Sequence, residues 1–502
     1  MTDQQPTPPS LSLNPLLRVV LFMVVGMVVG LCLSEQYIAN LHIYAALAFF
    51  VTVILSLLFF RRRYLSGGML LVSCLAFGLW LAVNADRKGR VVLPATEVEY
   101  DAVLFSEPVR HGKVVMCDLV LPGLPSNTTV QASILCDTVS ERYLRLHVGD
   151  GIHAYSAFEK PDGRARRYRT FIYYSNWEKA AVSLKTLSLS SRLRLRALKL
   201  RQQLVSRLMS TTAGHDELAV VVAMTLGDKS LLTKDVKDMY SVTAASHVLA
   251  LSGLHLSILY GVIMLLLAPF RRRLLVQVLL LTTIWTYTWL VGLSPSVVRA
   301  ATMLSIYSIV TLLYRDRVSF NVLAFSAILM LIISPHSLLD VGFQLSYLSV
   351  AAILLFVPLL TYAVRNTLIR RWRLTSWLYD LLAVSVAAQL GTAPLVAYYF
   401  GRFSCLFLLS SLFAVPLVTL ILWVALLFFL TAFLPTVQLW IGSVLTALAR
   451  LLNGSLAAIA SIPGASIEHL RPSVVQVIGC YILILVAYTF TLILLRRHVN
   501  RY

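Results

Sequence analysis

Long apolar runs, separated by short polar or basic segments, dominate the hydropathy pattern of this chain. A helix needs about 20 apolar residues to cross the hydrocarbon core of a bilayer, and most of the runs approach that length. The pattern therefore predicts a polytopic α-helical membrane protein with about 12 spans. The runs are 16–33, 39–60, 68–83, 247–269, 274–293, 297–314, 320–334, 343–364, 377–400, 405–433, 439–460 and 474–495.

Basic residues recur between the runs in an alternating way. Arginines fill positions 61–63, and further basic groups lie at 271–273, 315–317, 365–373 and from 496 onward. Such groups are retained in the cytoplasm, so counting from them places both termini inside and the segment after the third run outside. The polar N-terminus has no basic region and no cleavage site of the signal-peptide type, so the first run is expected to be a retained helix.

Composition agrees with a membrane protein. The 502 residues are 58% hydrophobic and only 13% charged, which excludes an ordinary soluble enzyme. The formal net charge of +20 suits a polyanionic partner, but cytoplasmic loops of membrane proteins also collect Lys and Arg. Net charge alone does not choose between these explanations.

The segment 84–180 has a different character. Short apolar stretches at 98–107, 113–121, 129–137 and 151–159 alternate with turn signals, which predicts a small β domain outside the cytoplasm. The pattern alone permits any small barrel or sandwich. Cys117 and Cys136 lie symmetrically about the turn sequence LPSN, so a simple hairpin would place them opposite each other. The alternatives are a disulfide and two buried thiols.

Cations and aromatic residues are interleaved at the end of this domain. A strand of nucleic acid needs positive charge for its phosphates and flat rings for its bases, so this stretch is a candidate single-stranded DNA site. The alternative is a basic loop followed by an aromatic belt at the membrane surface. The candidate residues are Arg164, Arg166, Arg167, Arg169, Tyr173, Tyr174 and Trp177.

Residues 181–235 contain a basic amphipathic helix, which we expect to lie on the membrane surface. The stretch 240–260 then places Ser252, Gly253 and His255 in an otherwise apolar run. Polar groups at membrane depth usually face a protein interior or water, and Ser252 with Gly253 is expected to loosen the helix there. His247 and His255 are eight residues apart, about 80° around a helix, which does not suit a metal pair.

Four more polar side chains lie in or beside later runs. Arg299 must pair, reach the interface or face water, and Asp340 lies at a helix entrance one turn before Gln344. Two interpretations are open: these residues line one pathway, in which Arg299 contacts phosphate or pairs with Asp340, or they simply hold helices together. The pathway set also includes His247, Ser252, Gly253, His255 and Gln389. No metal or cofactor motif is present, so we expect neither and predict that the chain is not an enzyme.

Several of these stretches resemble the ComEC-type competence proteins, inner-membrane proteins that pass single-stranded DNA into transformable bacteria. The similar stretches are LGD at 226–228, HVLALSGLHLS from His247, GLSPSVVRAATM from Gly292, SPHSLLDVGFQLSYLSVAAI from Ser334 and AAQLGTAPLVAYYFGRFS from Ala387. The resemblance implies an OB-like barrel for the β domain and a channel domain over 236–502, after N-terminal helices in 1–83. Two features depart from the family: Ser411 stands where an Asn is common, and the chain lacks the HxHxDH motif of the metallo-β-lactamase-like domain.

The resemblance also implies a location and partners. The protein is expected in the bacterial inner membrane, with single-stranded DNA, the lipid bilayer, a separate nuclease, cytoplasmic DNA-translocation proteins and a second copy of the chain as partners. Two rival functions remain open from the residues alone. One is a small-solute or lipid-linked transporter with an accessory β domain. The other is a membrane hydrolase that uses His247 or His255 with Ser252, which requires an orienting acid nearby.

Overall fold

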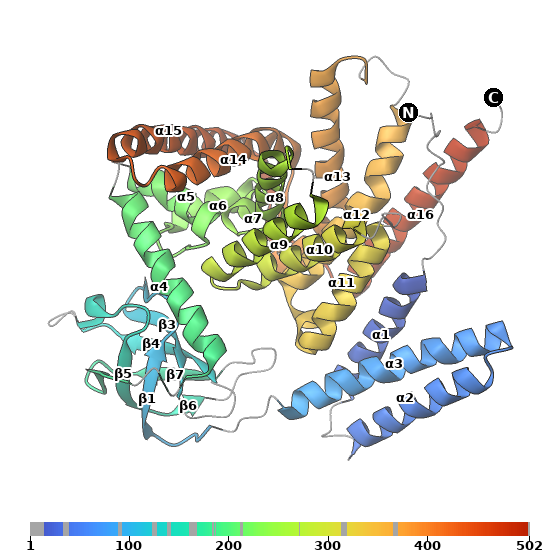
Figure 1. Cartoon of the computed structure of the whole chain (residues 1–502), viewed down its shortest axis with the longest axis horizontal. Coiled ribbons are helices and arrows are strands. Elements are labelled where there is room, and N and C mark those ends of the chain that lie inside the picture. Colours follow the sequence, from blue (N-terminus) through green and yellow to red (C-terminus); the bar gives the residue numbers. More distant parts are fainter. Residues whose placement is uncertain are drawn as a thin grey trace.

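The computed structural model of the protein contains three N-terminal helices, a β domain and a larger helical body (Figure 1). Ten helices in the described part of the chain are long and apolar enough to cross a membrane, which agrees with a polytopic membrane protein. Two shorter apolar helices, Gly253–Leu267 and Phe320–Ile333, correspond to two further predicted spans. The structure describes residues 15–33, 40–88, 93–122, 128–137, 142–159, 168–182, 185, 187–210, 214–270, 272–312, 319–364 and 370–499.

The N-terminal helices are α1 (Pro15–Cys32), α2 (Leu41–Leu58) and α3 (Arg63–Lys88). Small residues allow α1 and α3 to pack closely, as is common between membrane helices. A Cβ atom at Gly26 would collide with the carbonyl oxygen of Leu75, and one at Gly78 would collide with that of Met23. Met23 also packs with Met330 of α11, so this bundle is joined to the helical body.

The β domain is built from strands that form one sheet in the order β6-β7-β4-β3-β1-β5-β8, with β2 paired to β3. Only Ala157 separates β5 from β6, so one bent segment pairs with β1 at one end and with β7 at the other. The sheet thereby curls into a ring, in which β4 and β7 run parallel. The strands are β1 (Val98–Leu104), β2 (Val109–His111), β3 (Val114–Val120), β4 (Thr129–Leu135), β5 (Gly151–Ser156), β6 (Phe158–Glu159), β7 (Arg169–Ile172) and β8 (Trp177–Ala180), with a 3-10 helix η1 (Arg142–Arg145) before β5.

The register of β3 and β4 does not place Cys117 opposite Cys136, so the disulfide, one of the two alternatives, is wrong. Cys117 lies opposite Ala132, and Cys136 is four residues further along, where its N–H donates to the carbonyl of Lys113. This register buries alternate apolar residues of both strands in the core of the domain. Both cysteines are free, and Cys117 is buried.

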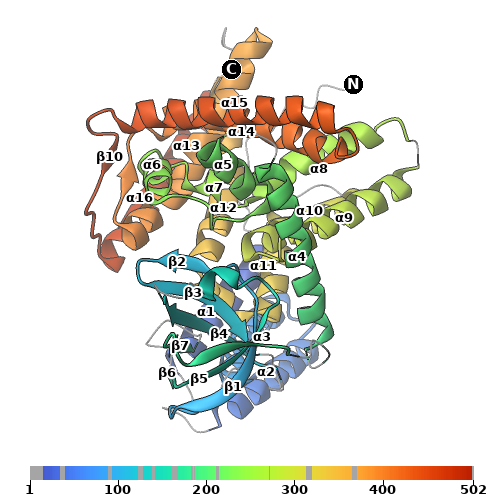
Figure 2. The same cartoon turned by 90° about the vertical axis from the view of Figure 1, so that its left-hand side faces the viewer.

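Helix α4 (Leu189–Met209) connects the β domain to the helical body (Figures 1 and 2). It begins at Ser188, whose hydroxyl accepts a hydrogen bond from the N–H of Ser191. Leu195 and Leu198 pack against the β domain, while Leu208 joins the core of the helical body. Protein therefore covers the side of α4 that contains these residues, whereas Leu193 and Leu200 are exposed. The position of this helix on the membrane surface stays a prediction.

The helical body is centred on α5, a short helix in which residues 218–226 are all buried. Helices α14 and α15 pack against each other and against α5, α6 and α7 (Figure 2). The elements are α5 (His215–Leu226), α6 (Lys234–Val242), α7 (Ser246–Leu249), α8 (Gly253–Leu267), α9 (Arg273–Leu290), α10 (Pro295–Leu312), α11 (Ser319–Ile333), η3 (Pro335–Leu339), α12 (Val341–Ala363), α13 (Arg373–Phe400), β9 (Phe403–Ser404), α14 (Phe407–Leu430), α15 (Pro435–Ala460), β10 (Ser466–Ile467) and α16 (Val474–Val499).

Candidate functional site

The apolar run that begins at His247 is not a continuous helix. Helix α7 ends at Leu249, the backbone is extended at Ala250 and Ser252, and α8 begins at Gly253. The predicted loosening of the helix is therefore confirmed as a break. Ala244, just before α7, has a left-handed φ of 58°, and its carbonyl lies 2.9 Å from Nδ1 of His247. Left-handed backbone at a non-glycine residue is strained, and such strain concentrates at functional positions.

Buried His255 and half-buried Ser252 form a polar pair at the start of α8. Ser252 Oγ lies 2.9 Å from Nδ1 of His255, and the Ser252 N–H donates to the same nitrogen at 3.3 Å. His255 is 3% exposed, and its Nε2 has no hydrogen-bond partner among the described residues. A Ser–His hydrolase needs an acid that orients the second ring nitrogen. The described surroundings of His255 supply none, so the pair caps the helix and leaves one nitrogen available.

A second polar group lies where α10 and α12 begin. Arg299 is 4% exposed, and its Nη1 lies 3.4 Å from Oδ2 of Asp340. Asp340 also caps α12, because its Oδ1 accepts a hydrogen bond from the N–H of Gly342 at 3.1 Å. The predicted pairing of Arg299 with Asp340 is therefore present. The Nε of Arg299 is buried and has no partner among the described residues.

Gln344 extends this group to α13. Its Nε2 donates to the carbonyl of Leu338 at 2.9 Å, and its Oε1 accepts a hydrogen bond from the Tyr399 hydroxyl at 3.0 Å. One side chain thus connects η3, α12 and α13. Gln389, the other predicted glutamine, is half-buried further back on α13 and does not belong to these bonds.

The two polar groups lie on either side of α10. A Cβ atom at Gly253 would come 3.7 Å from Cβ of Ala300, and one at Gly342 would come 3.2 Å from Nη2 of Arg299. The first turns of α8, α10 and α12 are therefore neighbours. Helix N-termini carry partial positive charge, so these helices and Arg299 together favour an anionic group.

Ser294 belongs to the same region, although the sequence interpretation did not single it out. It precedes Pro295 at the start of α10, and its Oγ is buried without a partner among the described residues. A Ser directly before a Pro at a helix start is a recognisable cap signal. Since buried polar atoms normally have partners, the free atoms of Ser294, His255 and Arg299 leave room for a polar ligand or water.

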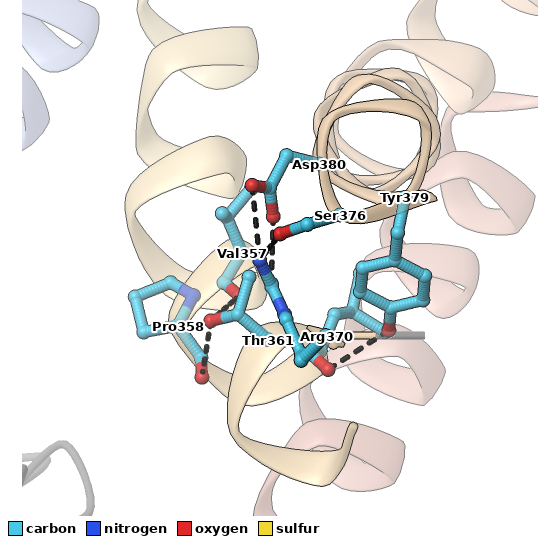
Figure 3. A network of polar contacts seen from close by, with 8 residues as sticks. Val357, Pro358, Thr361, Arg370, Ser376, Tyr379 and Asp380 are labelled. Carbon is cyan, nitrogen blue, oxygen red and sulfur yellow. Dashed lines mark hydrogen bonds and ion pairs between the residues drawn. The ribbon is translucent and has the colours of Figure 1, made fainter. Parts of the chain in front are cut away.

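Tertiary contacts also identify partners that the sequence left unassigned. Nε of Arg450 lies 3.1 Å from Oε1 of Glu217, which joins α15 to α5. Arg370 makes two contacts with the Asp380 carboxylate, at 2.7 and 3.0 Å, and a third with Ser376 (Figure 3). These bonds order the start of α13, and the neighbouring Tyr379 hydroxyl, which donates to the carbonyl of Leu360 at 2.8 Å, joins that start to the end of α12.

The DNA-binding candidates of the β domain fall into three sets. Arg169, Tyr173 and Tyr174 are exposed, and the ring centroid of Tyr173 lies 5.2 Å from that of Phe171, which is exposed as well. Trp177 differs from the expectation, because it is only 6% exposed and packs in the core of the domain. It cannot stack on a base in this position. Arg164, Arg166 and Arg167 lie outside the described residues.

Among the described residues, no group of three or more His, Cys, Asp or Glu side chains is arranged to hold a metal ion. Fold and site together define a multi-pass membrane protein with a β domain and with polar side chains at the adjoining starts of three core helices. The competence protein family matches residues 224–493, which is more than half of the chain and includes both polar groups. The chain belongs to the competence protein family.

Three curated relatives are similar to part of the chain. ComE operon protein 3 of Bacillus subtilis is 29% identical over 257 residues, covering 50% of this chain and 31% of the relative. An uncharacterized protein of Aquifex aeolicus is 33% identical over 183 residues, covering 36% of this chain and 40% of the relative. The uncharacterized protein YcaI of Escherichia coli is 25% identical over 238 residues, covering 44% of this chain and 30% of the relative. The matches thus span less than half the length of each relative, and no solved structure matches the chain.

Proposed function

We propose that this protein is the inner-membrane channel component that passes single-stranded DNA into the cytoplasm during natural transformation. The observation that carries the proposal is the group of helix starts around Arg299, in a chain of the competence protein family. A buried guanidinium beside helix N-termini can exchange its carboxylate partner for a passing phosphate, since both are anions that Arg binds through paired hydrogen bonds.

The β domain supports this proposal as the receiving surface. We infer an OB-like barrel from its ring of strands. With β2 left out and the bent segment β5–β6 counted as one strand, β4 and β7 are the third and fifth strands of the ring in chain order, and these two pair in parallel. OB-folds bind single strands through one sheet face and its flanking loops. The arginine-rich sequence 160–167 joins β6 to β7, and exposed Tyr173 and Tyr174 follow β7. Charge and rings of this kind bind single strands without sequence preference.

The charge pattern supports a direction of transport. If the basic groups near 271–273 and 365–373 are cytoplasmic, then the starts of α8, α10 and α12 face outward, with both chain termini inside. DNA would meet the β domain first and the Arg299 group next. A separate nuclease and cytoplasmic translocation proteins would supply the strand and the pulling force, and the chain itself would perform no chemical step.

The test is uptake of labelled DNA by the native host, with surface-bound and internalised DNA measured separately. Deletion of the gene should abolish internalisation and leave surface binding intact. Restoring the gene with Arg299→Gln should lower internalisation about tenfold or more, which corresponds to about 1.4 kcal/mol. The matched control is Arg450→Gln, which removes an arginine of another ion pair.

Protein abundance in the membrane must be equal for the two variants. Internalisation that is unaffected by deletion would refute the channel function and favour a small-solute or lipid-linked transporter. If the deletion strain fails to internalise DNA but the Arg299→Gln variant internalises it normally, Arg299 is not part of the pathway.

A further inference from the structure

One ring nitrogen of His255 is a buried polar atom that the fold leaves without a partner. His255 is 3% exposed, and no atom of the described residues forms a hydrogen bond with its Nε2. Buried polar atoms are almost always satisfied by protein, by ordered water or by a ligand. What Nε2 can bind depends on whether it carries the proton of the imidazole ring.

The backbone of Ser252 decides where that proton lies. A backbone N–H can only donate a hydrogen bond, and the Ser252 nitrogen lies 3.3 Å from Nδ1 of His255. Nδ1 must therefore accept, so it carries no proton. The Ser252 hydroxyl, 2.9 Å from Nδ1, is a second donor to the same atom. Since a neutral imidazole has one acceptor and one donor nitrogen, the ring is uncharged and its proton is on Nε2.

The Nε2–H group of His255 needs an acceptor, and a second buried donor lies on the next helix. Nε of Arg299 is buried without a partner among the described residues, and a guanidinium nitrogen never accepts a hydrogen bond. His255 lies two residues after Gly253, and Arg299 directly precedes Ala300. A Cβ atom at Gly253 would come 3.7 Å from Cβ of Ala300, so the two donors are on helix turns that touch. A ligand that satisfies them must offer acceptor oxygens.

The full charges at these helix starts cancel. Arg299 has Asp340 as its ion-pair partner at 3.4 Å, and the His255 ring is neutral. The partial positive charge of the starts of α8, α10 and α12 remains, and it favours an anionic acceptor over a neutral one. A site of this kind binds a phosphate oxygen by hydrogen bonds without a surplus full charge. It can therefore release the phosphate again, as conduction requires.

We propose that His255 is a neutral hydrogen-bond donor of the pathway, whose Nε2–H binds a phosphate oxygen at the adjoining starts of α8 and α10. The inference rests on the proposed function, because the phosphate is that of the passing strand. Ser252 is the positioning residue, since its N–H holds the ring in the required tautomer. Free phosphate offers the same oxygens, and a buried water is the competing occupant.

Nitrogen NMR of the full chain in lipid nanodiscs, with isotope-labelled histidine, tests the donor directly. The resonances of His255 are those missing from the spectrum of His255→Asn. We expect an unprotonated Nδ1 and a protonated Nε2 at neutral pH. Single-stranded oligothymidylate should shift the Nε2 resonance, whereas sodium chloride of equal ionic strength should not.

Inorganic phosphate is the second probe, and it distinguishes the two sources of the ligand. A shift with phosphate but not with oligothymidylate would support the donor and assign free phosphate as its ligand. A protonated Nδ1 would overturn the proposal. The absence of a shift with either probe would overturn it as well, and would leave a buried water only.

Two substitutions separate the donor from the helix cap. Asn has an oxygen at the position of Nδ1, so His255→Asn keeps an acceptor for the Ser252 N–H and loses the Nε2–H donor. Gln has an amide N–H near the position of Nε2, so His255→Gln keeps a donor and loses the cap. One lost hydrogen bond should lower DNA internalisation by His255→Asn about two- to tenfold.

Stability and uptake should therefore rank the two variants in opposite orders. His255→Gln should unfold at a lower temperature than His255→Asn and yet internalise more DNA. The matched control is His215→Asn, which changes an exposed histidine at the start of α5 and should alter neither property. A role of His255 in stability alone predicts that the less stable variant internalises less DNA, and that result would overturn the proposal. Should His255→Asn fail to reach the membrane, the Nε2 shift, assigned with His255→Gln, decides.

The donor and the channel function fail separately. If uptake does not need the gene but a probe shifts the Nε2 resonance, the channel function alone is refuted. If uptake needs the gene but is normal in His255→Asn, the role of the donor in passage alone is refuted.

Discussion

Replacing Asp340 by Asn should expose the energetic role of the buried arginine. The guanidinium of Arg299 is 4% exposed and has Asp340 as its ion-pair partner at 3.4 Å. At this distance the attraction is about 5 kcal/mol for an effective dielectric constant of about 20, and about 1 kcal/mol in bulk water. Since the Asp340 side chain is 48% exposed, the effect lies between these limits. Asp340→Asn should lower the free energy of unfolding by about 1–3 kcal/mol.

A second substitution separates the charge from the helix cap. Asn keeps a side-chain oxygen that can accept the hydrogen bond from Gly342, so Asp340→Asn removes the charge alone. Asp340→Ala removes both, and should cost about 1 kcal/mol more. The difference between the two variants measures the cap.

The measurement is the free energy of unfolding in mixed detergent micelles, combined with a double-mutant cycle of Arg299→Gln and Asp340→Asn. The control is Glu217→Gln, which breaks the other ion pair at 3.1 Å, where the Arg450 side chain is 69% exposed. This control should cost about 0–1 kcal/mol. Equal costs at the two sites, or a cycle without coupling between Arg299 and Asp340, would refute the reasoning from burial.

Three further predictions concern the packing and the thiols. Gly26→Val should weaken the packing of α1 on α3 by about 1–3 kcal/mol, measured by thermal unfolding, whereas Gly67→Val has no neighbour within 4 Å and should be neutral. Trp177→Ala should destabilise the β domain by about 3–5 kcal/mol. Tyr173→Ala should leave stability unchanged and weaken binding of an oligonucleotide by about 1–3 kcal/mol. Weakened binding without loss of stability in Trp177→Ala would place Trp177 on the surface. Burial raises the pKa of Cys117 to about 12, so maleimide should label it only after unfolding at about pH 8, and the folded domain should lose stability as pH rises toward 12.

Much of the candidate site was foreseeable because polar residues are conspicuous in an apolar run. Ser252 and Gly253 indicated a loosened helix, and the structure breaks the helix there. Arg299 needed a partner, and Asp340 was one of the predicted alternatives. Ser294 was less visible, because a serine before a proline is also common in ordinary loops.

Other positions could not be assigned from the chain alone. Trp177 sits in a stretch of cations and aromatics, yet strand alternation turns its side chain into the core while Tyr173 and Tyr174 remain outside. The separation of Cys117 from Cys136 depends on register, and symmetry about a turn does not fix it. The partners of Arg450 and Arg201 lie on elements distant in sequence.

The sequence by itself determined that the protein is a polytopic membrane protein with a β domain and a helix loosened near Ser252, because apolar length, alternation and basic loops are local properties. The tertiary structure alone decided which helix starts adjoin, that the strands form a ring, and that Arg201 pairs with Asp228. Those contacts depend on the packing of residues far apart in the chain, and no local pattern encodes such distances.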